Sequence, residues 1–173
     1  MARQRLLIDG YNLLWISGNV GRGRGTGWLE RARRSLLHQL ERSLPPDLVL
    51  DTLVVFDTSQ PSPSPDPTSD PQPRVPVEFA MGYASADERL IEHIRRHPHP
   101  RKLVVVSSDH AIQNAARRRR ATVVDSDVFW DRLLAGRIAS LWGDVPSIQP
   151  QEPKEGMTEA DTGHWIDLFL NED

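Results

Sequence analysis

Runs of apolar residues that end in an aspartate recur along the chain. Arg5–Asp9, Thr52–Asp57 and Lys102–Asp109 are dominated by Leu, Ile and Val, and Ala121–Asp125 is a shorter run of the same kind. Aliphatic runs without alternation are typical of strands that are buried on both faces of a parallel sheet. A fifth segment, Arg74–Phe79, alternates apolar and polar residues, and the proline within it confines it to a sheet edge.

Helical patterns lie between these runs. Apolar residues spaced three or four apart form four stripes, and each stripe predicts a helix with one buried face. The alternation of strand and helix predicts an α/β fold, a three-layer sandwich around a central, mainly parallel sheet. The stripes are Leu29, Ala32, Leu36, Leu37, Leu40 and Leu44; Leu90, Ile91 and Ile94; Ile112, Ala115 and Ala116; and Trp130, Leu133, Leu134, Ile138 and Leu141.

Two segments interrupt the alternation. Ser59–Pro73 contains six prolines and predicts a loop that leaves the sheet after the second strand. Pro and Gln are frequent beyond Leu141, and the chain ends in an acidic amphipathic stretch. We therefore expect one domain over residues 1–142, a linker over 143–157 and an acidic C-terminal helix or tail over 158–173.

Composition excludes several kinds of protein. The 173 residues include no cysteine, which rules out disulfides, thiolate zinc sites and a cysteine nucleophile. The chain has no signal-peptide pattern at its start and no apolar run near the ~20 residues of a membrane helix. We expect a soluble, cytoplasmic protein with no membrane partner.

The formal net charge of −3 conceals an asymmetry. From Asp144 onward there are eight acidic residues and one lysine, whereas the preceding residues carry an excess of basic groups. Nearly all basic residues are arginine, which binds phosphate bidentately and suits a nucleic-acid partner. A genome rich in G and C would favour arginine equally well, so composition alone leaves both explanations open.

Three of the aspartates, Asp9, Asp57 and Asp109, stand where predicted strands end. Ligands of open α/β sheets bind outside the carboxyl ends of the strands, so neighbouring strands would bring these carboxylates to one cleft. Asp87 adds a fourth, in the first turn of a helix whose start, Ser85–Glu88, has the pattern of a capping box. Its spacing from the apolar stripe predicts that Asp87 points with the core rather than to open solvent.

Converging carboxylates repel one another unless a cation lies among them. Hard oxygen ligands select Mg²⁺ or Mn²⁺, which can activate water and stabilise charge on a phosphodiester. For any single aspartate, a role as turn or helix cap is the simpler interpretation. Asn12 likewise fits either a cap or a group that orients a phosphate or a bound water. The set of four on one edge favours a functional site.

Basic residues follow the first strand. Arg22, Arg24, Arg31 and Arg34 lie in a glycine-rich loop and the helix after it, where they can hold RNA phosphates or simply provide solubilising charge. The loop matches neither G-x-G-x-x-G nor the P-loop pattern, so we expect no nucleotide cofactor.

Four short motifs resemble those of a known family. Leu7–Asn12 (LIDGYN) resembles the DGYN signature of NYN domains, which are PIN-like nucleases. Residues 54–57 (VVFD), 85–91 (SADERLI) and 106–109 (VSSD) resemble three further motifs of these domains. Order and spacing agree over about residues 5–141. The YacP-like subgroup is the most similar, and its characterised relatives include a ribosome-dependent messenger-RNA endonuclease.

The resemblance implies a PIN-like sandwich that hydrolyses RNA, including RNA on the ribosome, with bound Mg²⁺ or Mn²⁺. Asp9, Asp87 and Asp109 would be metal ligands, Asp57 a further ligand or a group that orients one, and Asn12 would position substrate or water. Relatives carry Gly-Ala before the last strand, where this chain has Arg120-Ala121, which affects a helix cap.

Two other functions compete with the nuclease. A catalytically silent RNA- or ribosome-binding adaptor could use the same fold, although retention of all four aspartates counts against it. A phosphatase with an aspartyl nucleophile needs an acid two residues after the first aspartate, and position 11 is Tyr.

Overall fold

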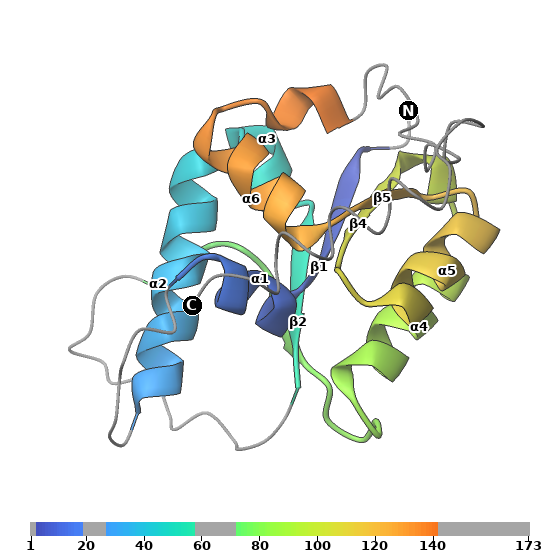
Figure 1. Cartoon of the computed structure of the whole chain (residues 1–173), viewed down its shortest axis with the longest axis horizontal. Helices are drawn as coiled ribbons and strands as arrows, with labels where there is room; N and C mark the ends of the chain where they lie inside the picture. Colours follow the sequence, from blue (N-terminus) through green and yellow to red (C-terminus); the bar gives the residue numbers. More distant parts are fainter. Residues whose placement is uncertain (1–2, 19–26, 58–71, 142–173) are drawn as a thin grey trace, which may run out of the picture. The chain divides into compact units, whose positions relative to one another are not determined.

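A five-stranded sheet forms the centre of the protein. The computed structural model describes residues 3–18, 27–57 and 72–141. All neighbouring strands are parallel, in the order β3-β2-β1-β4-β5 (Figure 1). The prediction of an α/β fold with a mainly parallel sheet is confirmed. The strands are β1 (Arg5–Asp9), β2 (Thr52–Phe56), β3 (Val77–Phe79), β4 (Leu103–Val106) and β5 (Thr122–Val124).

The strands are shorter than the apolar runs that predicted them. Lys102 belongs to a 3₁₀ turn, η1 (Pro100–Lys102), and β4 ends at Val106, so Ser107 and Asp109 lie beyond the strand. β3 is an edge strand, as predicted, and the proline at position 76 stands just before it. The shortening leaves polar residues at the carboxyl edge, where the sheet gives way to helices.

Helices cover both faces of the sheet, which completes the predicted three layers (Figure 1). One face is packed by residues of α1, α2, α3 and α6, and the other by residues of α4 and α5. The helices are α1 (Gly10–Ile16), α2 (Trp28–Ser43), α3 (Pro46–Val49), α4 (Ala86–Arg96), α5 (His110–Arg118) and α6 (Ser126–Leu134), and a second 3₁₀ turn, η2, spans Ile138–Leu141.

The fourth predicted stripe is broken in two. Helix α6 ends at Leu134, and Gly136 follows in a left-handed conformation with φ of 65°. The side chain of Leu134 is 58% exposed, so its assignment to the core was wrong, whereas Ile138 and Leu141 are buried from the separate turn η2. Spacing alone cannot detect this break, because a 3₁₀ turn and a helix place residues three apart on similar faces.

A close contact accompanies the turn after β1. A Cβ atom on Gly10 would lie 2.5 Å from two ring carbons of Phe56 and 2.8 Å from the carbonyl oxygen of Val55. Only glycine therefore lets the chain turn from Asp9 directly into α1 under this ring.

Some expectations lie outside the described residues. These are the linker over 143–157, the tail over 158–173 and the Ser59–Pro73 loop up to residue 71. The domain limits therefore stay a prediction. Within the described residues, no helix is long and apolar enough to span a membrane.

Candidate functional site

The parallel sheet brings three of the predicted aspartates to one edge. Asp9 is the last residue of β1, Asp57 follows β2 directly, and Asp109 comes three residues after β4. Because β2, β1 and β4 are neighbours and all parallel, their carboxyl ends lie together. Asp87 reaches this region from the first turn of α4. We call these four residues the acidic edge.

Asp9 is the most enclosed of the four. Its side chain caps α1 by accepting the backbone N–H of Asn12 at 3.1 Å, and its other oxygen accepts the side-chain amide of Asn12 and the hydroxyl of Ser107 at 3.0 Å. Burial raises the pKa of Asp9, and the Asn12 and Ser107 hydrogen bonds oppose this rise, while the charge of Asp109 adds to it. The carboxylate is thus held in one orientation.

Ser107 links two members of the acidic edge and was missed in the sequence. Its fully buried hydroxyl donates to Asp9 and accepts the backbone N–H of Asp109 at 3.1 Å. Asp109 in turn caps α5, with Oδ1 accepting from Ala111 and Ile112 at 2.8 and 3.0 Å. The available signal was a serine that continues a fully buried strand without a break, where an unpaired hydroxyl would be costly.

A second buried polar residue supports the same turn. The side-chain amide of Gln113 donates to the carbonyl of Ser107 at 2.9 Å and to Asp125 at 2.6 Å. Arg117 donates to the side-chain oxygen of Gln113, Oε1, at 3.0 Å. Gln113 therefore ties the end of β4 to the end of β5, and its burial inside an apolar helix face explains why sequence periodicity did not identify it.

The predicted orientation of Asp87 was wrong. Its side chain is exposed, and the buried face of α4 consists of Ala86, Leu90 and Ile94, which are spaced four apart. Ser85 caps the helix as predicted, although Glu88 accepts the N–H of residue 84 rather than that of Ser85. The apolar stripe thus runs along a line one position away from Asp87.

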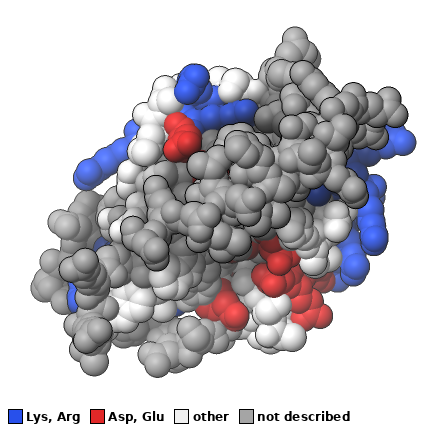
Figure 2. Space-filling view, in the orientation of Figure 1, with Lys and Arg blue, Asp and Glu red and all other residues white. Residues whose placement is uncertain are grey.

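Asp87 nevertheless interacts with the other three acids. Although the side chain is exposed, the surrounding protein displaces part of the water around its carboxyl group, which raises the pKa of Asp87, and the charges of Asp9, Asp109 and Asp57 raise it further. Four carboxylates from four separate segments therefore share one electrostatic environment. Acidic side chains gather in the lower part of the view in Figure 2.

The donors of the acidic edge suit a hard divalent cation. All are carboxylate oxygens, and a cation would relieve the repulsion that raises the pKa of Asp87. Among the residues that the structure describes, no three His, Asp or Glu side chains form a ready-made ligand group. Mg²⁺ commonly keeps several waters and uses one or two carboxylates. The residues therefore fit a cation that is bound partly through water.

The structure describes Asn12 and two of the four arginines that the sequence assigned to RNA binding. Asn12 bonds Asp9 through both its backbone and its side chain. Arg31 and Arg34 lie in the first turns of α2, where Arg34 pairs with Glu30 at 3.7 Å. Arg22 and Arg24 lie outside the described residues.

Arg33 differs from its basic neighbours because it is buried. Its guanidinium carbon lies 5.4–5.5 Å from the ring centroids of Tyr11, Phe56 and Phe79, and it donates to the Tyr11 hydroxyl. Its Nε has no partner among the described residues. The position could have been recognised, since residue 33 shares the helical spacing of Leu36 and Leu40.

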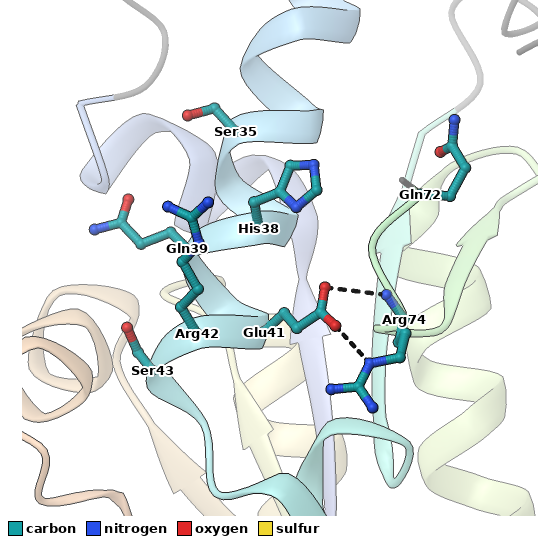
Figure 3. A pocket seen from close by; sticks show the side chains of 8 residues that line it. All are labelled: Ser35, His38, Gln39, Glu41, Arg42, Ser43, Gln72 and Arg74. Atoms are coloured by element: carbon teal, nitrogen blue, oxygen red, sulfur yellow. Dashed lines mark hydrogen bonds and ion pairs between the residues drawn. The ribbon is translucent and has the colours of Figure 1, made fainter. Parts of the chain in front are cut away.

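A polar groove of about 910 Å³ lies elsewhere, between the second half of α2 and residues 72–74 (Figure 3). Glu41 spans it by accepting from the side chain and backbone of Arg74 at 2.6 and 3.3 Å. No member of the acidic edge lines this groove.

Known proteins resemble both the sequence and the fold. The crystal structure of a mutant of Rae1 (YacP) from Bacillus subtilis is similar with a TM-score of 0.59 and 21% identity, over 77% of this chain and 76% of that one. A second crystal structure of Rae1 (YacP) from the same organism gives 0.52 and 21%, over 76% and 74%. No curated protein matches the chain. The fold is consistent with the PIN-like class. The model of the YacP-like NYN domain matches residues 6–141, and the chain belongs to this family.

Proposed function

We propose that this protein is a metal-dependent endoribonuclease that hydrolyses RNA phosphodiester bonds at the acidic edge. One observation carries the proposal: Asp9, Asp57 and Asp109 stand at or just beyond the carboxyl ends of three neighbouring parallel strands, and Asp87 joins them from the first turn of α4. Structural ion-pair networks place acids beside bases, whereas this set places acids beside acids. Family membership, which suggests a nuclease, supports the same proposal.

Each residue of the edge has a proposed part. Asp9, Asp87 and Asp109 hold Mg²⁺ or Mn²⁺, and Asp57 is a further ligand or orients one. The bound ion supplies an activated water and offsets charge on the phosphate. Asn12 and Ser107 fix the oxygens of Asp9.

The capping bonds of Asp109 use Oδ1, so its second oxygen makes no hydrogen bond to the described residues. We assign that oxygen to the cation. Arg22, Arg24, Arg31 and Arg34 hold the RNA backbone in this proposal, because arginine pairs with phosphate oxygens. The substrate is RNA, either free or associated with the ribosome, in the cytoplasm.

The test combines metal binding with cleavage. Mn²⁺ titration calorimetry and cleavage of RNA, both free and on translating ribosomes, are measured for wild type, Asp109→Asn and Asp127→Asn. Asparagine still caps a helix, so Asp109→Asn should fold. Asp127 is an exposed first-turn acid of α6 outside the acidic edge, which makes it the matched control.

We expect Asp109→Asn to lose Mn²⁺ binding and cleavage while Asp127→Asn keeps both. Absence of Mn²⁺ binding by wild type at millimolar concentration, or equal cleavage by all three proteins, would overturn the proposal.

The adaptor remains the second candidate because of one observation, the lack of a ready-made group of three ligands among the described residues. It predicts RNA or ribosome binding that is unchanged in Asp109→Asn, together with no cleavage by wild type on either form of RNA. The same samples therefore distinguish the two functions.

A further inference from the structure

Basic side chains gather at the end of the protein opposite the acidic edge. Helices α4 and α5 pack against each other, and both run from the carboxyl edge of the sheet towards its amino edge. Their C-terminal ends and the turn η1 between α4 and β4 carry eight basic residues, all exposed. We call this set the basic edge; it consists of Arg95, Arg96, Arg101, Lys102, Arg117, Arg118, Arg119 and Arg120.

The view in Figure 2 shows Lys and Arg side chains on the right, where Figure 1 draws α5, and acidic side chains below. The nine residues of α5 span roughly 14 Å at 1.5 Å per residue, so the two charged edges are about one helix length apart. The charge separation is thus a property of the fold: acids follow strands and precede helices, whereas arginines end the helices.

Most arginines of the basic edge have no carboxylate partner among residues 3–18, 27–57 and 72–141. Of its seven arginines, only Arg96 pairs with a carboxylate of a described residue, Glu92 at 2.9 Å. Arg119 donates instead to the carbonyl oxygen of His97 at 3.0 Å. Arg95 and Arg101 form no hydrogen bond or ion pair within the described residues. Exposed arginines without a carboxylate partner among the described residues are available to a polyanion.

Helix electrostatics account for only part of this set. Cations in the last turn of a helix interact favourably with its dipole, which suits Arg95, Arg117 and Arg118. Arg101 belongs to a 3₁₀ turn, and Arg120 lies beyond α5 with φ of 61°, a conformation that arginine rarely adopts. Arg120 closes α5 through its backbone, whose N–H donates to the carbonyl oxygen of Arg117 at 2.9 Å, and this role does not require a basic side chain.

We propose that the basic edge is a second RNA-binding surface, which holds base-paired RNA through its phosphates. Arginine matches phosphate geometry bidentately. Residues 95–102 and 117–120 contain no Phe, Tyr or Trp, and His97 and His99 are their only aromatic side chains, so the surface has few rings on which unpaired bases could stack. Duplex RNA is recognised mainly by shape and backbone contacts, which this surface offers. The inference rests on RNA being the substrate, and it places a duplex about one helix length from the cleavage site.

The test measures binding separately from cleavage. A fluorescein-labelled RNA duplex is titrated, in EDTA and at several KCl concentrations, with full-length protein carrying Asp109→Asn, so that cleavage cannot contribute. The basic-edge variant combines three further substitutions with Asp109→Asn, one from each segment of the basic edge: Arg95→Gln, Arg101→Gln and Arg118→Gln. None of these three side chains bonds a described residue. The matched control has the same change of charge on the other side of the sheet, at α2, at α6 and just after α6. Its substitutions are Arg42→Gln, Arg132→Gln and Arg137→Gln.

We expect the basic-edge variant to bind on the order of tenfold or more weakly, with a slope of log K against log salt that is smaller by about 2–3, one contact per lost arginine. The control should keep the affinity and the slope of its parent. Equal losses in both variants, or no duplex binding by the parent protein, would overturn the inference. A protein that binds the duplex but never cleaves RNA would refute the proposed nuclease and leave the basic edge intact.

Discussion

Ser107 and Ser126 provide a comparison in which one change removes a hydrogen-bonded hydroxyl and the other removes an unpaired one. Both side chains are completely buried at the carboxyl edge of the sheet. The Ser107 hydroxyl donates to Asp9 and accepts from the N–H of Asp109. The Ser126 hydroxyl has no partner among the described residues. Substitution by alanine should therefore affect stability in opposite ways.

The magnitude for Ser107→Ala follows from the two bonds. A hydrogen bond to a charged group contributes about 1.5–3 kcal/mol and a neutral one about 0.5–1.5 kcal/mol, so the expected loss is roughly 2–4 kcal/mol. For a chain of this length this corresponds to a fall in Tm of roughly 5–15 °C. Ser126→Ala removes a buried group that lost its water on folding, so this variant should be at least as stable as wild type.

Urea unfolding at neutral pH, with circular dichroism as the signal, measures both changes. An unchanged m-value would show that the shift in midpoint reports stability alone. Equal midpoints for Ser107→Ala and Ser126→Ala would refute the argument, because they would mean that the Ser107 bonds to Asp9 and Asp109 contribute nothing.

Three further predictions concern other parts of the domain. The raised pKa of Asp87 means that its ionised form opposes folding. Asp87→Asn should therefore be more stable than wild type at pH 7 and lose this advantage below about pH 4, as measured by urea unfolding at both pH values. A gain of equal size at both pH values would contradict the assigned cause. Gly10→Ala should cost about 1–3 kcal/mol because its Cβ would overlap the Phe56 ring and the Val55 carbonyl. Thermal unfolding that matches wild type would show that the ring is free to move. Arg120→Gly should raise stability by about 1 kcal/mol, since glycine adopts a φ of 61° without strain, and a lowered urea midpoint would show that the arginine side chain contributes more than its backbone strain costs.

Much of the fold could be read from the sequence alone. Aliphatic runs such as Arg5–Asp9 predict strands that are buried on both faces, because an exposed face would need polar residues at alternate positions. The apolar stripes between these runs predict the helices. Since parallel strands end at one edge, the terminal aspartates were predictable at that edge, whereas the strand order that makes β2, β1 and β4 neighbours came from the structure. The match of the YacP-like NYN domain over residues 6–141 confirmed the family resemblance.

Tertiary structure decided what local periodicity does not encode. Asp87 lies one position off the buried face of α4, a rotation that depends on how the helix packs against the sheet and α5. Ser107 became the link between Asp9 and Asp109 only when β4 was paired beside β1 in this register. The burial of Arg33 likewise needed three rings from three segments. Side-chain chemistry and spacing along the chain thus determined which residues reach the edge, whereas their partners, burial and ionisation followed from long-range packing.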